Sequence, residues 1–542
     1  MELDKKTKIK LNIIAIISII ILAFAISPKT LQNDTFYTIK IGEYILENGI
    51  TMQDPFSWHE LSYTFPHWLY DVMIYLIYSI GGHLGIYIST IVFAAILGIV
   101  MYITTDKLTK NKPLSFIFTI VGLYLIKSYI AARAQLVTFI LFVLEILFIE
   151  SFLETKKKRY VAGLVIIPIL LANLHAAVFY FYFILYLPYI AEYLISLMIK
   201  YFKNTPERKI KTLNKKIEKC TDEKKLEQLN KKLQKLEQSF NKETKKQEPY
   251  KITVTLKNTT KWLIIIMILC MFTGFLTPQR TEPYTHLVKL MQGNSTKNIS
   301  EHLPLTLANN IKYACVLISF IAIMMFTDTK IRLCDLFMLG GLTVLTFMTR
   351  RQESMFVIIC LPIFVRLITA FWNKYDKTAI EKMTRGMTSI CGTIITICLI
   401  LIVSMLLYNT RYKDKYVSES SYPVQASDWI LENLDLNEIK LYNEYNFGSY
   451  LLYRGIPVFI DSRCDLYTPE FNEDVNIFND FLSISGLSTK NLEGLFDKYG
   501  FTHFIVNSKA KLTIYLDAKP DEYNLIYSDD YFYIYERKTT NL

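Results

Sequence analysis

The chain has 542 residues, of which 52% are hydrophobic and 20% are charged, and its formal net charge is +11. Apolar residues come in runs of about 17 to 23, the length that crosses the hydrocarbon core of a bilayer, and this excludes an ordinary soluble protein. The excess of Lys and Arg falls in short loops between these runs and in one Lys-rich insert, a pattern that indicates cytoplasmic loops and no nucleic-acid partner.

The first apolar run, about Leu11–Ile26, follows a basic start and is interpreted as a retained signal-anchor helix whose N-terminus stays in the cytoplasm. The polar loop after it, residues 28–68, is therefore expected on the outer face. Within this loop, Thr35–Glu47 has apolar residues at helical spacing and predicts an amphipathic helix lying in the membrane interface. Asn48-Gly49 ends that helix.

Later apolar runs alternate in direction, and basic residues gather at their inner ends. Trp68–Ser79, stopped by Gly81-Gly82, is too short to span and is expected to lead laterally into the second span. The predicted spans after the first are about Leu84–Ile103, Leu114–Ala132, Leu136–Phe152, Val161–Ala177, Phe179–Ile199, Trp262–Leu276, Thr306–Phe326, Leu333–Met348, Met355–Phe371 and Met387–Leu407. Residues 1–408 are thus predicted to form an α-helical, multi-pass domain of about eleven spans in the plasma membrane.

Two segments between the spans are long. Residues 200–257 carry apolar positions three and four apart on both sides of Thr221-Asp222, which predicts a charged helical hairpin in the cytoplasm. This hairpin is either a docking or regulatory element or a dispensable insertion. Residues 277–305 form a second outer loop that contains His286 and Glu301.

The remainder, residues 409–542, alternates helical and strand-like segments and predicts a small α/β domain outside the cell. The helices are expected at Ser427–Asn433 and Asn491–Tyr499. The strand-like segments are Lys440–Tyr453, Pro457–Tyr467, His503–Val506 and a terminal hairpin of Tyr523–Tyr527 with Tyr531–Tyr535.

Cations mark the outer ends of several predicted spans, where charges are costly to place: Arg133, His175, Arg350 and Arg351. Ordinary interface snorkelling is the alternative explanation for each of them. Together with the carboxylates of the first outer loop, they suit transfer from a phosphate-linked donor. The acceptor hydroxyl needs a general base, and a departing phosphate needs positive charge.

Asp34 is the first candidate for that base, because it opens the outer loop directly after the first span. Its other interpretation is an N-cap of the following helix. Asp54 lies in a turn signature, Asp54-Pro55-Phe56-Ser57, and is a second candidate. His59 and His67 can orient a phosphate or a carboxylate, or can anchor the membrane interface beside Trp58 and Trp68. His286 is a further candidate for substrate contact.

The outer domain carries Asp461, Arg463 and Asp465 after an apolar segment, the usual place for a binding site in an open α/β sheet. An internal ion pair of Arg463 with Asp461 or Asp465 is the alternative. Because a sugar–phosphate bond on a lipid carrier stays near the headgroups, this domain is expected to handle the acceptor and not to supply the base.

Loose motifs occur in a particular order along nearly the whole chain outside the Lys-rich hairpin. They are Asp34 with Gly42 and Ile50 before Asp54-Pro55-Phe56-Ser57; Trp68-Leu69 ahead of Tyr78 and Gly81-Gly82; Arg133 with Gln135-Leu136; Asn173 with His175; Pro278 and Glu301; Arg350 or Arg351 ahead of Pro362; Gly448, Tyr450 and Leu451; and Phe459-Ile460-Asp461 with Arg463 and Asp465-Leu466-Tyr467. In this order they resemble the GT-C superfamily of polyprenyl-phosphate-sugar-dependent glycosyltransferases, and more closely a group of bacterial GT-C-like membrane proteins. The chain departs from that pattern at Ala134, Ala176, Thr277-Pro278-Gln279-Arg280 and Ser462.

The resemblance implies an inverting transferase that moves a sugar from a polyprenyl-phosphate carrier to a cell-envelope acceptor, with Asp34 at the reaction centre. Arg133, His175, Arg350 and Arg351 would hold the carrier phosphate, and Glu301 would shape the acceptor side. No cofactor is certain; a divalent metal, Mg or Mn, with Asp34, Asp54 and Glu301 as ligands is an option. A transporter or flippase of a lipid-linked envelope precursor and a non-catalytic membrane scaffold are the alternatives.

Overall fold

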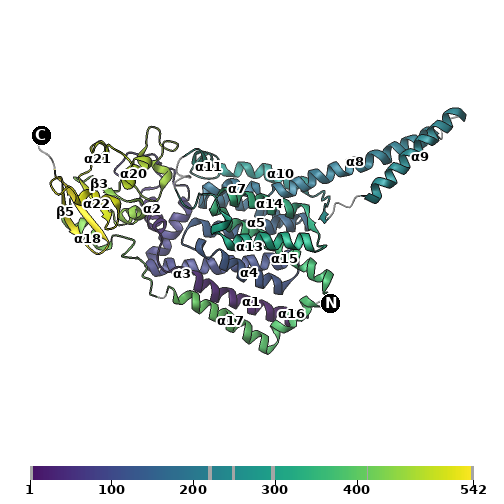
Figure 1. Ribbon diagram of the computed structural model, residues 1–542, viewed down its shortest axis with the longest axis horizontal. Helices are drawn as coiled ribbons and strands as arrows, with labels where there is room; N and C mark the ends of the chain where they lie inside the picture. Colours follow the sequence, from purple (N-terminus) through teal and green to yellow (C-terminus); the bar gives the residue numbers. More distant parts are fainter. Residues whose placement is uncertain (1–3, 218–222, 247–250, 294–298, 412, 539–542) are drawn as a thin grey trace.

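The computed structural model describes residues 4–217, 223–246, 251–293, 299–411 and 413–538. The molecule is elongated, and three parts follow one another along its long axis (Figure 1). A sheet region with the C-terminus forms one end, a helical bundle forms the middle and a helical hairpin forms the other end. The N-terminus lies at the hairpin end of the bundle.

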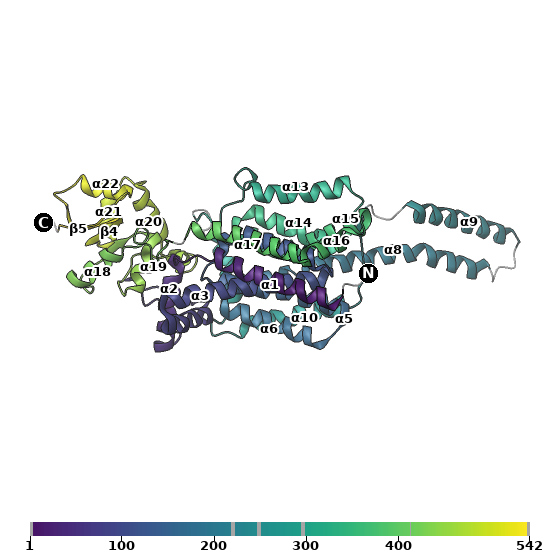
Figure 2. The same ribbon diagram turned by 90° about the horizontal axis from the view of Figure 1, so that it is seen from below.

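The bundle consists of helices that run side by side along the long axis (Figure 2). Each apolar run predicted as a span is helical over most of its length. The helices are α1 (Lys5–Ile26), α3 (Trp68–Thr109), α4 (Lys112–Leu125), α5 (Ala134–Thr155), α6 (Lys158–Leu174), α7 (Phe179–Ile184), α8 (Leu187–Ile217), α10 (Thr260–Cys270), α13 (Ile311–Phe326), α14 (Leu333–Met348), α15 (Glu353–Tyr375), α16 (Ala379–Thr388) and α17 (Ile390–Asn409). Short 3-10 turns connect them: η1 (Lys127–Tyr129), η2 (Ala176–Val178), η3 (Met271–Phe275), η4 (Leu307–Asn309) and η5 (Arg350–Gln352).

Within the described residues, six helical segments are long and apolar enough to cross a membrane: Lys5–Ile26, Trp68–Thr109, Ala134–Thr155, Ala176–Phe202, Arg350–Tyr375 and Ile390–Asn409. Shorter apolar helices accompany them at Lys112–Leu125, Thr260–Phe275, Ile311–Phe326 and Leu333–Met348. The chain is therefore mainly helical and has helices of membrane-spanning length, as the sequence predicts.

Helix α2 (Asn33–Asn48) confirms the predicted helix but not its predicted place in the membrane interface. It packs between α3 and α19 (Tyr445–Tyr453), and its apolar face, including Phe36 and Ile39, is buried. Gly42 permits the contact with α3, because a Cβ atom there would lie 2.2 Å from the carbonyl oxygen of Asp71. The helix begins after Gln32, so Asp34 lies in its first turn and is not the N-cap.

Helix α3 joins the predicted lead-in to the second span. The backbone is kinked at Gly82, whose φ of 56° lies in the left-handed region that glycine tolerates. The change of direction predicted at Gly81-Gly82 is thus present inside one long helical segment.

The helical hairpin is formed by the distal part of α8 and by α9 (Glu223–Lys246), and it projects beyond the bundle (Figure 1). The predicted turn at Thr221-Asp222 lies outside the described residues. After α9 the chain returns to the bundle through β1 (Ile252–Thr253), which pairs in parallel with β2 (Ile331–Arg332).

The C-terminal region contains a four-stranded sheet of order β3-β4-β6-β5. Strands β3 (Leu441–Asn443) and β4 (His503–Asn507) are parallel, and β6 (Phe532–Arg537) runs antiparallel to β4 and to β5 (Tyr523–Ser528). Helices α18 (Val424–Asn433), α20 (Ile477–Gly486), α21 (Leu492–Tyr499) and α22 (Lys511–Asp517) belong to the same region. The predicted strand around residue 504 and the predicted terminal hairpin are present.

Two strand-like segments were predicted wrongly. Of Lys440–Tyr453, three residues form β3, and Tyr445–Tyr453 is α19. The buried residues Phe447, Tyr450 and Leu451 are spaced by three and one, which fits one face of a helix. Pro457–Tyr467 holds one isolated bridge, Val458 with Ser57, and ends in the 3-10 turn η6 (Cys464–Tyr467).

The first outer loop shares a core with the C-terminal region. Tyr63 and Phe65 of the loop are buried in one cluster with Tyr442, Phe459 and Phe504. This shared core places the loop between the bundle and the sheet, where the candidate site lies.

Candidate functional site

A cavity of about 530 Å³ lies where the bundle meets the C-terminal region. Its wall combines α2, the first outer loop, the start of α5 and helix α11 (Glu282–Gln292). The start of α19 and the residues around the start of η6 also contribute to it. The predicted site residues that line it are Asp34, His67, Arg133, His175, His286, Glu301, Arg351, Arg463 and Asp465. Residues from very different parts of the sequence are thus brought together around one cavity.

A smaller pocket of about 240 Å³ shares part of this wall and adds Arg350. The residues common to both are Gln32, Arg133, Gln135, Ser300, Glu301 and Arg351. The two hollows therefore meet at Arg133 and Arg351.

Arg133 joins Asp34 and Glu301, two of the cavity carboxylates that the sequence singled out. Its Nη2 lies 2.6 Å from Asp34 Oδ2, and its Nη1 lies 3.2 Å from Glu301 Oε1. Burial alone would lower the pKa of Arg133, but the two carboxylates outweigh it and raise the pKa. Burial likewise acts to raise the pKa of Glu301, and Arg133 and Arg351 outweigh it and lower the pKa. Arg133 and Glu301 are therefore both charged at neutral pH.

The turn that carries Asp34 is fixed from both sides. Asn33 Nδ2 donates to the carbonyl oxygen of Tyr445 at 3.0 Å, and Thr35 Oγ1 donates to that of Ala132 at 3.2 Å. Asp34 also lies in the first turn of a helix, where free N–H groups favour a negative charge. These contacts hold the carboxylate at the cavity wall.

Arg350 and Arg351 occupy the tight turn η5 before α15. The Arg350 side chain donates from Nε to the carbonyl oxygen of Pro304 at 3.3 Å, and the Arg351 backbone N–H donates to that of Glu301 at 3.2 Å. In the described part of the chain, the Arg351 guanidinium has no carboxylate within ion-pair distance. Its charge is therefore available to an anion in the cavity, unlike that of Arg133.

His175 and His67 face the cavity with their rings already held. His175 Nδ1 lies 3.0 Å from Thr138 Oγ1. His67 Nδ1 lies 2.9 Å from Asp71 Oδ1, and its Nε2 lies 3.3 Å from the Tyr37 hydroxyl. Trp68 does not line the cavity; its indole N–H donates to Asn173 Oδ1 at 3.1 Å and fixes the wall behind it.

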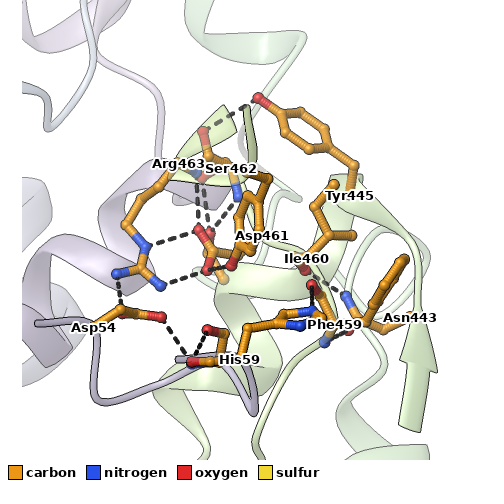
Figure 3. A network of polar contacts seen from close by, with 12 residues as sticks. Asp54, His59, Asn443, Tyr445, Phe459, Ile460, Asp461, Ser462 and Arg463 are labelled. Atoms are coloured by element: carbon orange, nitrogen blue, oxygen red, sulfur yellow. Dashed lines mark hydrogen bonds and ion pairs between the residues drawn. The ribbon is translucent and has the colours of Figure 1, made fainter. Parts of the chain in front are cut away.

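Arg463 is the centre of a buried cluster with Asp54, Asp461 and Tyr467 (Figure 3). Arg463 Nη1 donates to Asp54 Oδ1 at 2.6 Å, and its Nη2 and Nε donate to Asp461 at 2.6 and 2.9 Å. The Tyr467 hydroxyl donates to Asp461 Oδ2 at 2.6 Å. Side chains of Asp54 and Asp461 are fully buried, and neither lines the cavity.

This Arg463 cluster corresponds to the internal ion pair that the sequence left open as an alternative. Asp54 is its second carboxylate and not a cavity group. His59, which contacts the carbonyl oxygen of Phe459 at 3.1 Å, lies beside the cluster, and burial lowers its pKa to about 4. The cluster ties the first outer loop to the C-terminal region.

Helix α11 supplies a wall that the sequence indicated only through His286. Glu282, four residues before it, contacts His286 Nδ1 at 2.6 Å, and His286 Nε2 lies 3.6 Å from Asp465 Oδ2. Burial would lower the pKa of His286, but Asp465 and Glu282 raise it to about 9. The spacing of four residues between an acid and a histidine in the second outer loop is the signal that could have identified Glu282.

A second set of charges, at the hairpin end of the bundle, was not predicted. Arg332 Nη2 lies 2.5 Å from Glu150 Oε1 and 2.7 Å from Asp335 Oδ1, and Arg366 contacts the same two carboxylates at 3.3 and 2.9 Å. These four residues link α5, α14 and α15 far from the cavity.

The predicted metal ligands do not form a ligand set. Asp34 and Glu301 share the cation Arg133, and Asp54 is bound to Arg463. In the portions of the chain that the structure describes, no three His, Cys, Asp or Glu side chains are grouped to hold a metal ion. The three carboxylates predicted as ligands are thus ion-paired with Arg133 or Arg463.

The comparisons with known proteins give no family for the chain: no family model matches it, and no curated protein matches it.

Proposed function

We propose that the protein is a multi-pass glycosyltransferase of the plasma membrane, built on the GT-C plan, with about eleven spans, a cytoplasmic N-terminus and an extracytoplasmic C-terminal domain. It would move a sugar from a polyprenyl-phosphate carrier to a cell-envelope acceptor at the outer face. The observation that carries the proposal is one cavity lined by both a carboxylate, Asp34, and a guanidinium, Arg351, that has no carboxylate partner among the residues that the structure describes.

The proposed reaction is an inverting displacement. The acceptor oxygen forms a bond to the anomeric carbon while the bond from that carbon to the phosphate oxygen breaks, and the phosphate leaves with the electron pair. The acceptor proton passes to Asp34. Arg351, with Arg350 and His175 beside it, stabilises the leaving phosphate, while Arg133 positions Asp34 and Glu301.

The test is transfer of a radiolabelled sugar from a polyprenyl-phosphate donor by the purified full chain, with cell-envelope extract as acceptor. Asp34→Asn is expected to lower the rate by about 100-fold or more, because the base is lost while size and shape are kept. Asp428→Asn, an exposed carboxylate that pairs with Arg454 away from the cavity, is the matched control and should keep the wild-type rate. Near wild-type transfer by Asp34→Asn would show that the base is misassigned.

A transporter or flippase of a lipid-linked precursor also needs cations at the mouth of a bundle. It would move the intact carrier without breaking the sugar–phosphate bond. Flipping of the labelled donor in proteoliposomes, with no transfer product, would favour that alternative. The absence of both flipping and transfer would favour a scaffold.

A further inference from the structure

One part of the cavity wall differs in chemical character from the part that holds the Asp34–Arg133 pair. It is formed by Glu282, His286 and Lys289 on α11 and by Asp465 and Phe471 after the Arg463 cluster, and we term it the α11 wall. It contains no arginine that could hold a phosphate. Its polar groups alternate in sign from Glu282 to His286 to Asp465.

Of these three groups, Asp465 has the most exposed side chain. Its side chain is 30% exposed, whereas those of His286 and Glu282 are 8% and 5% exposed. Glu282 holds the imidazole from behind, so the ring is fixed with its Nε2 toward Asp465. The raised pKa of His286 keeps a positive charge next to Asp465 at neutral pH.

An aromatic ring lies next to the imidazole of His286. Phe471 lines the cavity, and its ring packs edge-on against His286 with the centroids 5.1 Å apart. The Lys289 ammonium lies 5.5 Å from the centroid of the same ring. The α11 wall thus offers a carboxylate that accepts hydrogen bonds, an ammonium that donates them, and an aromatic surface between them.

We infer that the α11 wall binds the acceptor, and that the acceptor is a carbohydrate. An ionised carboxylate can accept from two neighbouring hydroxyls of one sugar ring, and the C–H face of the ring suits the negative face of an aromatic side chain. A lipid acceptor would need an apolar wall, and a peptide offers a single hydroxyl. A cavity of about 530 Å³ also has the size of a site for ligands larger than one sugar ring.

This inference rests on the proposed function, but its test needs no donor and no turnover. The full chain in nanodiscs is titrated with maltose, lactose, chitobiose and a Ser/Thr-containing heptapeptide, and binding is measured by calorimetry and saturation-transfer NMR. At least one disaccharide is expected to bind, with a Kd that rises at least 10-fold in Asp465→Asn and in Phe471→Leu. Asp521→Asn and Tyr531→Leu, exposed residues that do not line the cavity, are the matched controls.

Asp465→Glu keeps the charge and should keep most of the affinity, which separates loss of contact from loss of fold. Binding of the peptide with the same dependence on Asp465, or no binding of any disaccharide by a protein that still binds the polyprenyl-phosphate donor, would overturn the inference. Disaccharide binding without donor binding would instead contradict the proposed transferase and leave the carbohydrate site intact.

Discussion

Two kinds of charged group occur near the cavity, and they differ in how many partners neutralise them. Arg463 makes ion pairs with two carboxylates and is 6% exposed, whereas Arg351 faces the cavity without such a partner in the described chain. The first kind stabilises the fold, and the second kind is ready to bind an anion. Sequence alone could not separate them, because both are arginines next to apolar segments.

Arg463→Ala is expected to destabilise the protein by about 3–5 kcal/mol, because Asp54 and Asp461 would remain buried without a counter-charge. The apparent midpoint of thermal unfolding measures this. Arg454→Ala, which removes a half-exposed pair with Asp428, should change stability by about 1 kcal/mol or less. Equal midpoints for the two variants would contradict the structural role of the Arg463 cluster.

His286 is expected to make the stability of the protein decrease as pH rises into the alkaline range. Its folded pKa of about 9 lies above the ordinary value of about 6.5, so the folded state holds a proton that the unfolded state releases. The stabilisation is complete below about pH 6.5 and is lost as pH rises through 9. The groups that face the ring are Glu282 on its own helix and Asp465 from the C-terminal region.

The measurement is the thermal midpoint between pH 6 and 10 for the wild type and for His286→Gln. The wild-type midpoint is expected to fall toward that of the variant as pH passes 9, and the two curves should then coincide. A constant difference between the curves across this range would show that His286 is not charged at neutral pH.

At the level of elements, the contact between α2 and α3 determines where Asp34 lies. Gly42→Ala is expected to lower the thermal midpoint and the transfer rate together, because its Cβ would lie 2.2 Å from Asp71 O and 2.6 Å from Tyr75 Cβ. Gly340→Ala on α14 is the matched control, since nothing lies within 4 Å of a Cβ there. The control should be neutral or stabilised by about 1 kcal/mol, as alanine favours helices over glycine.

The same elements show what the sequence could predict. Apolar runs of membrane-spanning length fixed the helices of the bundle, because a single physical requirement, burial of about 20 residues in hydrocarbon, determines them. The segment Tyr445–Tyr453 was misassigned, since a short run rich in tyrosine and leucine suits a strand as well as a helix. Contact of this segment with α2 selects the helix over the strand. That contact joins residues about 400 positions apart.

The candidate site was predicted in part for a similar reason. Five of its residues follow or precede apolar runs at the ends that the sequence predicts to face the same side: Asp34, Arg133, His175, Glu301 and Arg351. The predicted direction of the spans is therefore enough to group them. The pairing of Asp54 with Arg463 and the link from Glu282 to Asp465 depend on how the C-terminal region docks. No periodicity in the sequence carries that information.

For the whole molecule, the hairpin projects from one end of the helical bundle, and the C-terminal region adjoins the other end (Figure 1). The cavity lies at that other end, where the bundle meets the C-terminal region. Excising residues 205–246 and joining the ends with a short flexible linker should leave membrane insertion and transfer intact. A longer deletion that also removes Ile252 and Thr253 is expected to impair folding, because it eliminates the pairing of β1 with β2. Loss of transfer by the shorter, correctly inserted deletion would assign the hairpin a role in activity.

The proposed orientation is tested by labelling a cysteine-free background with a membrane-impermeant maleimide. Asp521→Cys in the C-terminal region should react in intact cells, and Lys209→Cys in the hairpin only after the membrane is permeabilised. Both positions are exposed, so a failure to react reflects the compartment and not burial. The reverse pattern would place the cavity in the cytoplasm.

The hydrogen bond between Asp54 and Arg463 joins residues 409 positions apart, and this separation has a consequence for biogenesis. At about 5–20 residues per second, the ribosome delivers Arg463 roughly 20–80 s after Asp54 has been synthesised. During that interval the first outer loop lacks its partner in the C-terminal region, and the cavity lacks the part of its wall that this region supplies. A nascent chain therefore completes the cavity only after its C-terminal region has been synthesised, and an interrupted or shortened chain leaves the cavity wall incomplete.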